Sequence, residues 1–289
     1  MAVWGSSFAI LRALMGESAA SPLALVSVRM ALASALLLGF LAATPGGRAQ
    51  LRGVRGGLLR DGVLVGALLG VGFLLQTEGL LRTTASRSGF LTGTLVVLTP
   101  LIEFALFRKR PALPALIGVL LAFIGMTALS APWSDASQAT ALGDALTLAC
   151  ALVFAGHIVA LGRVAPRHPV LPMVLVQLAT TCALAALAGP LVERQHFSGT
   201  PRLWLALLYL ALFATLLAFG VQTWAQRVLP AVRVALISSL EPVFAALWAS
   251  LLIGERLTGR ELLGGALIVL GVAVGEAGAA LRARARAPG

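Results

Sequence analysis

The sequence predicts an all-α polytopic membrane protein of ten transmembrane helices, arranged as two inverted five-helix repeats around a central cavity. Three observations predict this fold: the composition, the spacing of the apolar runs, and the similarity of the two halves. Of the 289 residues, 59% are hydrophobic and only 11% are charged, and the mean hydropathy is +0.95. A soluble domain is about 45–50% apolar and about 25% charged. So few charges could not cover a soluble surface, so we expect lipid around most of the chain.

Ten apolar runs are candidates for membrane spans, because about 20 mainly apolar residues cross a bilayer as a helix. The first run is short, and we expect further apolar residues upstream of it in the natural protein. Short connections join the runs, so we expect one membrane domain over residues 1–289, with a first half at 1–131 and a second at 143–280. The runs cover residues 1–15, 22–43, 61–81, 87–107, 112–131, 143–162, 170–191, 203–226, 234–253 and 262–280.

The basic residues predict the orientation of the chain. The 22 Lys and Arg residues outnumber 11 Asp and Glu, for a net charge of +11. They fall between apolar runs rather than on one face with stacking aromatics, which argues against nucleic acid as a partner. One set of alternate loops carries twice as many Lys and Arg as the other, and the richer side is expected in the cytoplasm. We therefore predict a multi-pass membrane protein with both termini cytoplasmic.

The two halves resemble each other at a shift of 146 residues. This shift places Gln76 on Gln222, and Gly118 and Gly125 on Gly264 and Gly271. An odd number of helices in each half inserts the second half upside down, and inverted repeats are a recurring plan of secondary transporters. Duplication of this kind also suits a membrane scaffold or a membrane-embedded enzyme acting on lipid-linked substrates, so both alternatives stay open.

Several motifs carry a resemblance to a known family. The stretches Trp4-Gly5-Ser6-Ser7-Phe8, Leu240-Glu241-Pro242-Val243 and Gly254-Glu255-Arg256-Leu257 resemble the EamA-type transporters of the drug/metabolite transporter superfamily. The resemblance implies a bacterial inner-membrane exporter of small metabolites, often amino acids, by alternating access. The first half departs from the pattern, with Thr99-Pro100 in place of Glu-Pro and Arg108-Lys109-Arg110 in place of the Gly-Glu-Arg turn.

Polar and aromatic side chains inside the spans are the candidates for a substrate cavity. Polar groups in lipid are costly and need a partner or a wet cavity. Gln76 and Gln222 are related by the repeat and are expected near the midplane, where they line the cavity or pack helices together. The alternatives for His157 are a satisfied hydrogen-bonding residue and a proton relay. The other candidates for the cavity wall are Phe219 and Trp224.

Two prolines and the acidic residues complete the set of candidates. Pro100 and Pro242 lie inside their spans and are predicted to kink them, either as hinges or as static curvature. Glu241 is the candidate for a group that senses charge by binding a proton or a substrate ammonium, with a structural hydrogen bond as the alternative. Glu78 is a further cavity candidate, although an ion pair with Arg29 would explain it equally well. The acidic residues expected to cap helices are Asp61 and Asp144.

The expected partners are a small-molecule substrate such as an amino acid, the lipid bilayer and protons. The sequence has no GxxxxGK[ST] phosphate-binding loop, so ATP is not expected to drive transport directly. It has no His, Cys and Asp residues at the spacing of a metal site and no GxSxG or HExxH motif. We therefore expect no metal, no cofactor and no enzymatic activity.

Overall fold

The computed structural model describes residues 1–5, 10, 20–83, 85–130, 140–194, 196–253 and 257–285. In this part of the chain, nine helical segments are long and apolar enough to cross a membrane. They agree with nine of the ten predicted runs. The first predicted run, at 1–15, lies mostly outside the described residues, as does the Gly254-Glu255-Arg256 turn.

The elements of the described part of the chain are helices joined by turns and short loops, with one isolated bridge between Ala20 and Phe197. In chain order its helices are α2 (Pro22–Ala43), α3 (Pro45–Arg52), α4 (Gly57–Leu80), α5 (Ala85–Gly93), α6 (Leu95–Phe107), α7 (Leu113–Ser130), α8 (Ala141–Val164), η2 (Ala165–Arg167), α9 (Val170–Val192), α10 (Pro201–Tyr209), η3 (Leu210–Leu217), α11 (Ala218–Ala225), α12 (Ala231–Ser238), α13 (Glu241–Ile253) and α14 (Gly259–Ala285).

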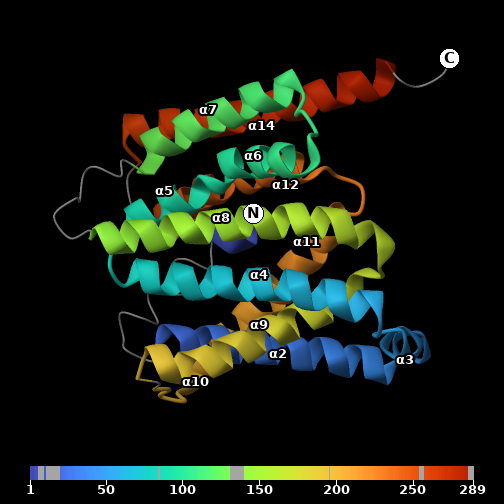
Figure 1. Ribbon diagram of the computed structural model, residues 1–289. Coiled ribbons are helices and arrows are strands. Elements are labelled where there is room, and N and C mark those ends of the chain that lie inside the picture. The colour runs from blue at the N-terminus through green and yellow to red at the C-terminus, as the bar shows by residue number, and fades with distance from the viewer. Residues whose placement is uncertain are drawn as a thin grey trace.

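The helices form a layered bundle (Figure 1). Helices α7 and α14 lie together along one edge, and α2, α9 and α10 lie at the opposite edge. Helix α8 runs through the middle and packs on α4, α5, α6 and α12. We call the end of the bundle where α8 begins the Thr140 end, and the end where α8 finishes the Arg163 end. Helix α8 of the second half thus joins the two halves, as do α9, which packs on α2 and α4, and α14, which packs on α7.

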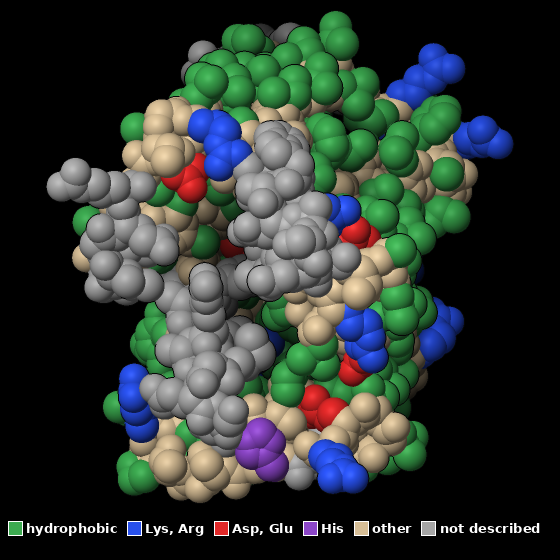
Figure 2. Space-filling view, turned by 90° about the vertical axis from the view of Figure 1, so that its left-hand side faces the viewer, with side chains coloured by type: hydrophobic (Ala, Val, Ile, Leu, Met, Phe, Trp, Pro, Cys, Tyr) green, Lys and Arg blue, Asp and Glu red, His purple; other side chains and the backbone are tan. Residues whose placement is uncertain are grey.

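Many large apolar side chains are exposed around the sides of this bundle. Leu64 is 53% exposed, Leu120 is 59% exposed and Leu152 is 51% exposed. Figure 2 looks onto the Thr140 end, where basic and acidic side chains lie next to one another among apolar ones. Apolar sides and charged ends are the distribution expected of a bundle that spans a bilayer.

Helices α7 and α14 approach each other through glycines. A Cβ built on Gly118 would lie 2.5 Å from the carbonyl oxygen of Gly271, and one built on Gly125 would lie 2.5 Å from that of Gly264. Such close packing of small residues is a usual way for membrane helices to associate. The repeat relates Gly118 to Gly264 and Gly125 to Gly271, so it maps each of these two contacts onto the other. The earlier glycine of α7 meets the later glycine of α14, so the two helices are antiparallel.

Two spans are interrupted at corresponding places. Thr94 separates α5 from α6, and Ser239 and Leu240 separate α12 from α13. Pro100 lies inside α6, whereas Pro242 is the second residue of α13. A proline is well tolerated in the first turn of a helix, because the amide it lacks would have no intrahelical partner there. Pro242 lies inside its predicted span, and the break in that span falls directly before it, at Ser239 and Leu240.

The span from Pro201 to Ala225 contains a π-helical segment, η3, between α10 and α11. The indole Nε1 of Trp4 donates a 2.8 Å hydrogen bond to the carbonyl oxygen of Ala214 in this segment. The hydroxyl of Thr215, next in the chain, is buried and has no partner among the described residues. Segments of π-helix are rare in proteins, and those that occur are often found at functional sites. The repeat relates this span to α4, which is a regular α-helix.

Candidate functional site

Aromatic side chains from several helices meet in the interior of the bundle. Trp4 packs edge-on against Phe219 at a centroid distance of 5.6 Å, and Phe73 packs in the same way against Phe154 at 5.6 Å. Phe219 also meets the ring of His157 at 6.5 Å. We call these five residues the aromatic cluster. Helices α4, α8 and α11 supply four of them, so the cluster joins the two halves of the chain.

Arg29 of α2 lies beside this cluster. Its guanidinium carbon is 5.2 Å from the centroid of the Phe73 ring, and the residue is 7% exposed. Among the described residues no oxygen accepts a hydrogen bond from its guanidinium, and its Nε atom is buried without a partner. The expected ion pair with Glu78 was wrong, because Glu78 pairs with Arg82 one turn further along the chain.

The environment of Arg29 is energetically unfavourable for a cation. Arg29 is the eighth residue of α2, which places it roughly 10 Å along the helix at 1.5 Å per residue. A charged arginine at the centre of a membrane helix costs about 2.5–3.5 kcal/mol or more. A desolvated cation–π contact such as that with Phe73 returns about 2 kcal/mol. The arrangement therefore leaves a buried positive charge only partly compensated by the protein.

His157 belongs to a buried polar network. Its Nε2 atom lies 3.4 Å from Oε1 of Gln177, whose Nε2 donates to the hydroxyl of Thr223 at 3.1 Å. All three residues are buried, and they connect α8, α9 and α11. A satisfied hydrogen-bonding residue was one of the two alternatives for His157, and this contact favours it. Gln177 and Thr223 were not among the predicted residues, although Gln177 is a polar residue inside an apolar run.

The two repeat-related glutamines lie near opposite ends of the bundle. Gln76 is half-buried in the last turns of α4, near the Thr140 end. Gln222 is 8% exposed in the last turn of α11, and its Nε2 lies 3.5 Å from Oε1 of Gln226. Gln226 in turn donates to the carbonyl oxygen of Ile158 at 2.6 Å. The expectation that both glutamines lie at the midplane was therefore wrong. The second half is inverted relative to the first, so positions that correspond in the repeat lie toward opposite ends of the bundle.

Among the described residues, the Oε1 atom of Gln222 is buried and has no hydrogen-bond partner. Glu241 is half-buried at the first position of α13, directly after the break in its span. Trp224 lies on the outside, with 62% of its surface exposed. The structure therefore keeps Gln222 and Glu241 in the interior and excludes Trp224 from the wall of an interior site.

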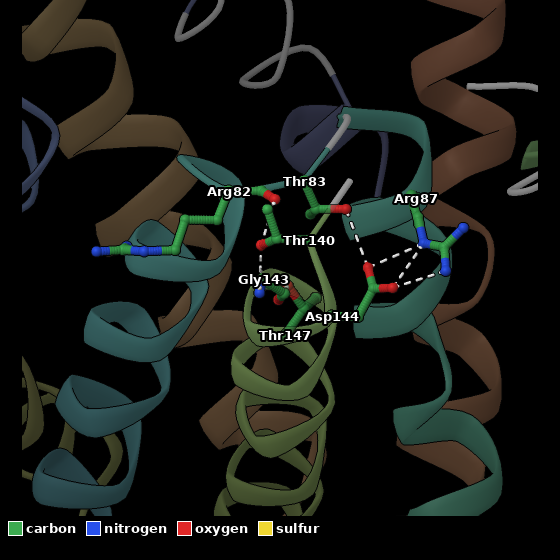
Figure 3. Close-up of polar contacts among 7 residues, drawn as sticks. All are labelled: Arg82, Thr83, Arg87, Thr140, Gly143, Asp144 and Thr147. Atoms are coloured by element: carbon green, nitrogen blue, oxygen red, sulfur yellow. Dashed lines mark hydrogen bonds and ion pairs between the residues drawn. The ribbon is translucent and has the colours of Figure 1, made fainter. Parts of the chain in front are cut away.

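A network of charged and polar groups closes the Thr140 end (Figure 3). Asp144 of α8 accepts from Nε of Arg87 at 2.9 Å and from the hydroxyl of Thr83 at 3.0 Å. The backbone amide and the hydroxyl of Thr140 both donate to the carbonyl oxygen of Arg82 at 3.0 Å. Asp144 is thus a bridge between the halves rather than the helix cap we expected, since Thr140 caps α8.

The Arg163 end is held differently. Asp61 of α4 accepts from Arg60 at 3.1 Å and lies 2.9 Å from Nε2 of His168, so it too is not a cap. Between α6, α8 and α12 there is a cavity of about 230 Å³. Three cations and one carboxylate are in its wall, which consists of Glu103, Lys109, Val159, Gly162, Arg163, Arg167, Pro230 and Ala231. Lys109 lies 3.6 Å from Glu103, so Arg163 and Arg167 give the wall of this cavity a net positive charge.

The described residues contain no group of three or more His, Cys, Asp and Glu side chains that could hold a metal ion. The two cysteines, Cys150 and Cys182, are both free thiols.

Comparison with known proteins identifies the family. The EamA-like transporter family matches residues 1–131 and, separately, residues 141–274. The chain belongs to the EamA-like transporter family. This EamA-like chain is therefore a multi-pass membrane protein of a transporter family, as its motifs indicated.

Curated relatives of this EamA-like chain are named as transporters. It is 31% identical to an uncharacterized transporter of Archaeoglobus fulgidus over 94% of this chain and 82% of that protein. It is 30% identical to a probable amino-acid metabolite efflux pump of Salmonella typhimurium, over 63% of this chain and 64% of that protein. A crystal structure with 21% sequence identity shares the fold, with a TM-score of 0.78 over 94% of this chain and 93% of that chain.

Proposed function

We propose that this EamA-like protein is an inner-membrane secondary transporter or facilitator, with both termini in the cytoplasm. It exports small metabolites, above all amino acids including aromatic ones, by alternating access between inverted repeats at 1–131 and 143–280. The reciprocal glycine contacts of α7 and α14 carry this proposal, because a shift of 146 residues exchanges them. Two copies of one unit in opposite orientations can exchange conformations, which opens the path to each side in turn. The amino-acid assignment rests on the efflux pumps among the relatives.

The contacts at the two ends support a state closed at the Thr140 end. There the Arg87–Asp144 ion pair joins α5 of the first half to α8 of the second, at 2.6 Å between Nη2 and Oδ2. The cavity between α6, α8 and α12 lies at the Arg163 end. The breaks at Thr94 and at Ser239–Leu240 allow helix segments to tilt, because few intrahelical hydrogen bonds cross them. If the orientation follows the distribution of basic residues, the cavity faces the cytoplasm, as an exporter awaiting substrate requires.

We propose that the aromatic cluster forms the substrate site and that Gln76 and Gln222 lie along the path on either side of it. Apolar walls with a few polar groups are the usual composition of small-molecule sites. Glu241 is proposed as the charge-sensing group, binding a proton or the substrate ammonium. Pro100 and Pro242 are proposed to fix where the broken helices bend.

The test is uptake of labelled amino acids, including L-phenylalanine, into liposomes containing the purified protein, with and without a pH gradient. The proposal predicts saturable uptake in protein-containing vesicles and not in empty ones. Accumulation above equilibrium under the gradient, lost in Glu241→Gln, would support proton coupling, and simple equilibration would identify a facilitator.

Absence of uptake for every amino acid would overturn the amino-acid assignment. Uptake with equal pH dependence in Glu241→Gln and in the unmodified protein would overturn the role of Glu241. The matched control is Glu261→Gln, since Glu261 makes only local hydrogen bonds to Thr258 at the start of α14.

A further inference from the structure

Arg29 is a buried cation that the described part of the protein leaves without an anion or a hydrogen-bond acceptor. It is 7% exposed, its Nε is unpartnered, and its guanidinium carbon lies over the face of Phe73, 5.2 Å from the ring centroid. Most other basic side chains with described contacts have oxygen partners, such as Arg87 with Asp144, and Arg233 with Glu276 at 2.8 Å between Nε and Oε1. Arg163 lies over the ring of Phe107, but it is exposed. Arg29 therefore differs from these arginines in lacking the partner that a structural role would supply.

We propose that Arg29 binds the carboxylate of the transported solute, while Phe73 and Phe154 contact the solute's apolar body. This inference rests on the proposed function and narrows its substrate class to small organic carboxylates with an apolar or aromatic side chain. A guanidinium presents parallel N–H donors that match the two oxygens of a carboxylate. Phe73 and Phe154 belong to the aromatic cluster and pack on the same core as Phe219, another of its members. A solute held by Arg29 would therefore contact this cluster.

The charge of the cavity at the Arg163 end fits the same solute. The cavity there has Lys109, Arg163 and Arg167 in its wall against the single carboxylate of Glu103. A cleft lined mainly by one sign of charge concentrates solutes of the opposite sign. A single unpaired arginine at the interior site matches a monoanion better than a multiply charged phosphate, since one cation would leave a dianion unneutralised.

The experiment compares three labelled probes in liposomes containing the full chain. L-phenylalanine has both a carboxylate and an ammonium, phenylpyruvate has only the carboxylate, and L-phenylalaninamide has only the ammonium. The unmodified protein is expected to move both carboxylates in preference to the amide. Arg29→Met should lower carboxylate uptake about tenfold or more, as expected on losing a charge-assisted contact. Arg29→Lys should retain part of it, and Arg227→Met, an exposed arginine of similar size, should change nothing.

A second readout separates a binding role from a structural one. The apparent melting temperature of Arg29→Met in detergent should be equal to or higher than that of the unmodified protein, because a buried charge has been removed. Phenylpyruvate should raise the melting temperature of the unmodified protein and not that of Arg29→Met. If Arg29→Met does not fold, the same comparison is made with Arg29→Lys, which keeps the charge but loses the paired donors.

The outcomes distinguish this inference from the proposed function. Equal carboxylate uptake by Arg29→Met and the unmodified protein would overturn the role of Arg29 and leave the transporter standing. A lower melting temperature of Arg29→Met with unchanged preference among the probes would make Arg29 structural. If the unmodified protein moves only the amide, the carboxylate class is wrong. If it neither moves a probe nor is stabilised by one, both the function for these solutes and the inference fail.

Discussion

Gly264 and Gly265 are neighbours in α14 that face different surroundings. A Cβ on Gly264 would lie 2.6 Å from the carbonyl oxygen of Gly125, whereas the nearest atom to a Cβ on Gly265 is a methyl carbon 3.8 Å away. Backbone atoms of α7 cannot move aside without shifting the whole helix. Close approach of the two helices therefore depends on Gly264 and not on Gly265.

We predict opposite effects for alanine at these two positions. Gly264→Ala should lower stability by about 1–3 kcal/mol, the usual cost of overpacking. Gly265→Ala should be neutral or stabilising by up to about 1 kcal/mol, because alanine favours the helix. Thermal unfolding in detergent measures both, and equal melting temperatures for the two variants would contradict the close contact.

The Arg87–Asp144 pair should be necessary for closure of the Thr140 end. Its side chains are 29% and 19% exposed, so breaking it should cost between about 1 kcal/mol, as for exposed pairs, and about 3 kcal/mol, as for buried ones. Asp144→Asn should lower the melting temperature and increase labelling of a cysteine at position 83 from that end. The exchanged pair, Arg87→Asp with Asp144→Arg, should restore both measurements in part, and failure of any rescue would argue against a direct pairing.

Gln177 should stabilise the centre of the second half through its two contacts. Gln177→Leu leaves His157 and Thr223 without the partners shown here, and a buried polar group without a partner costs about 1–3 kcal/mol. Thr180→Val is the matched control, since the Thr180 hydroxyl bonds only to the backbone carbonyl of Val176 in its own helix. A loss of stability no larger than that of the control would show that the network contributes little.

Phe219 and Trp224 should respond differently to truncation. Phe219 is 5% exposed within the aromatic cluster, and Trp224 is 62% exposed on the outside. Phe219→Ala should reduce uptake of L-phenylalanine, whereas Trp224→Ala should leave both the rate and the saturation of uptake unchanged. The comparison uses initial rates in liposomes at equal protein content, and a larger loss for Trp224→Ala would place the path elsewhere.

The sequence predicted the features that depend on composition and periodicity. Nine of ten spans follow from hydropathy, and the shift of 146 residues identified the glycines that meet between α7 and α14. Trp224 was misplaced although a signal was present: residues two apart on a helix point to opposite faces, so Trp224 could not share the face of Gln222.

Other features depend on tertiary contacts that no local pattern encodes. The pairing of Glu78 with Arg82 follows from i,i+4 proximity, but the isolation of Arg29 follows only from which side chains α4 and α9 bring near it. The π-helical segment at Leu210–Leu217 is equally invisible in the sequence. The carbonyl group of Ala214 in this segment is bonded to the side chain of Trp4, from a distant part of the chain.

Trp4 offers a test of that distant contact. Trp4→Phe keeps an aromatic ring beside Phe219 but removes the hydrogen bond to Ala214, so we expect a loss of about 1 kcal/mol in stability. Amide hydrogen exchange should rise locally in residues 210–217, and unchanged exchange there would show that the π-helical segment does not depend on Trp4.

Alternating access is tested most directly by measuring distances at both ends of one protein. Spin labels on exposed positions would report the Thr140 end through Leu81 and Leu142, and the Arg163 end through Leu106 and Arg167, with Cys150 and Cys182 replaced by alanine. Electron–electron resonance with and without L-phenylalanine should reveal two populations, in which the Thr140-end distance lengthens as the Arg163-end distance shortens. Distances that stay fixed, or that lengthen together, would contradict the account.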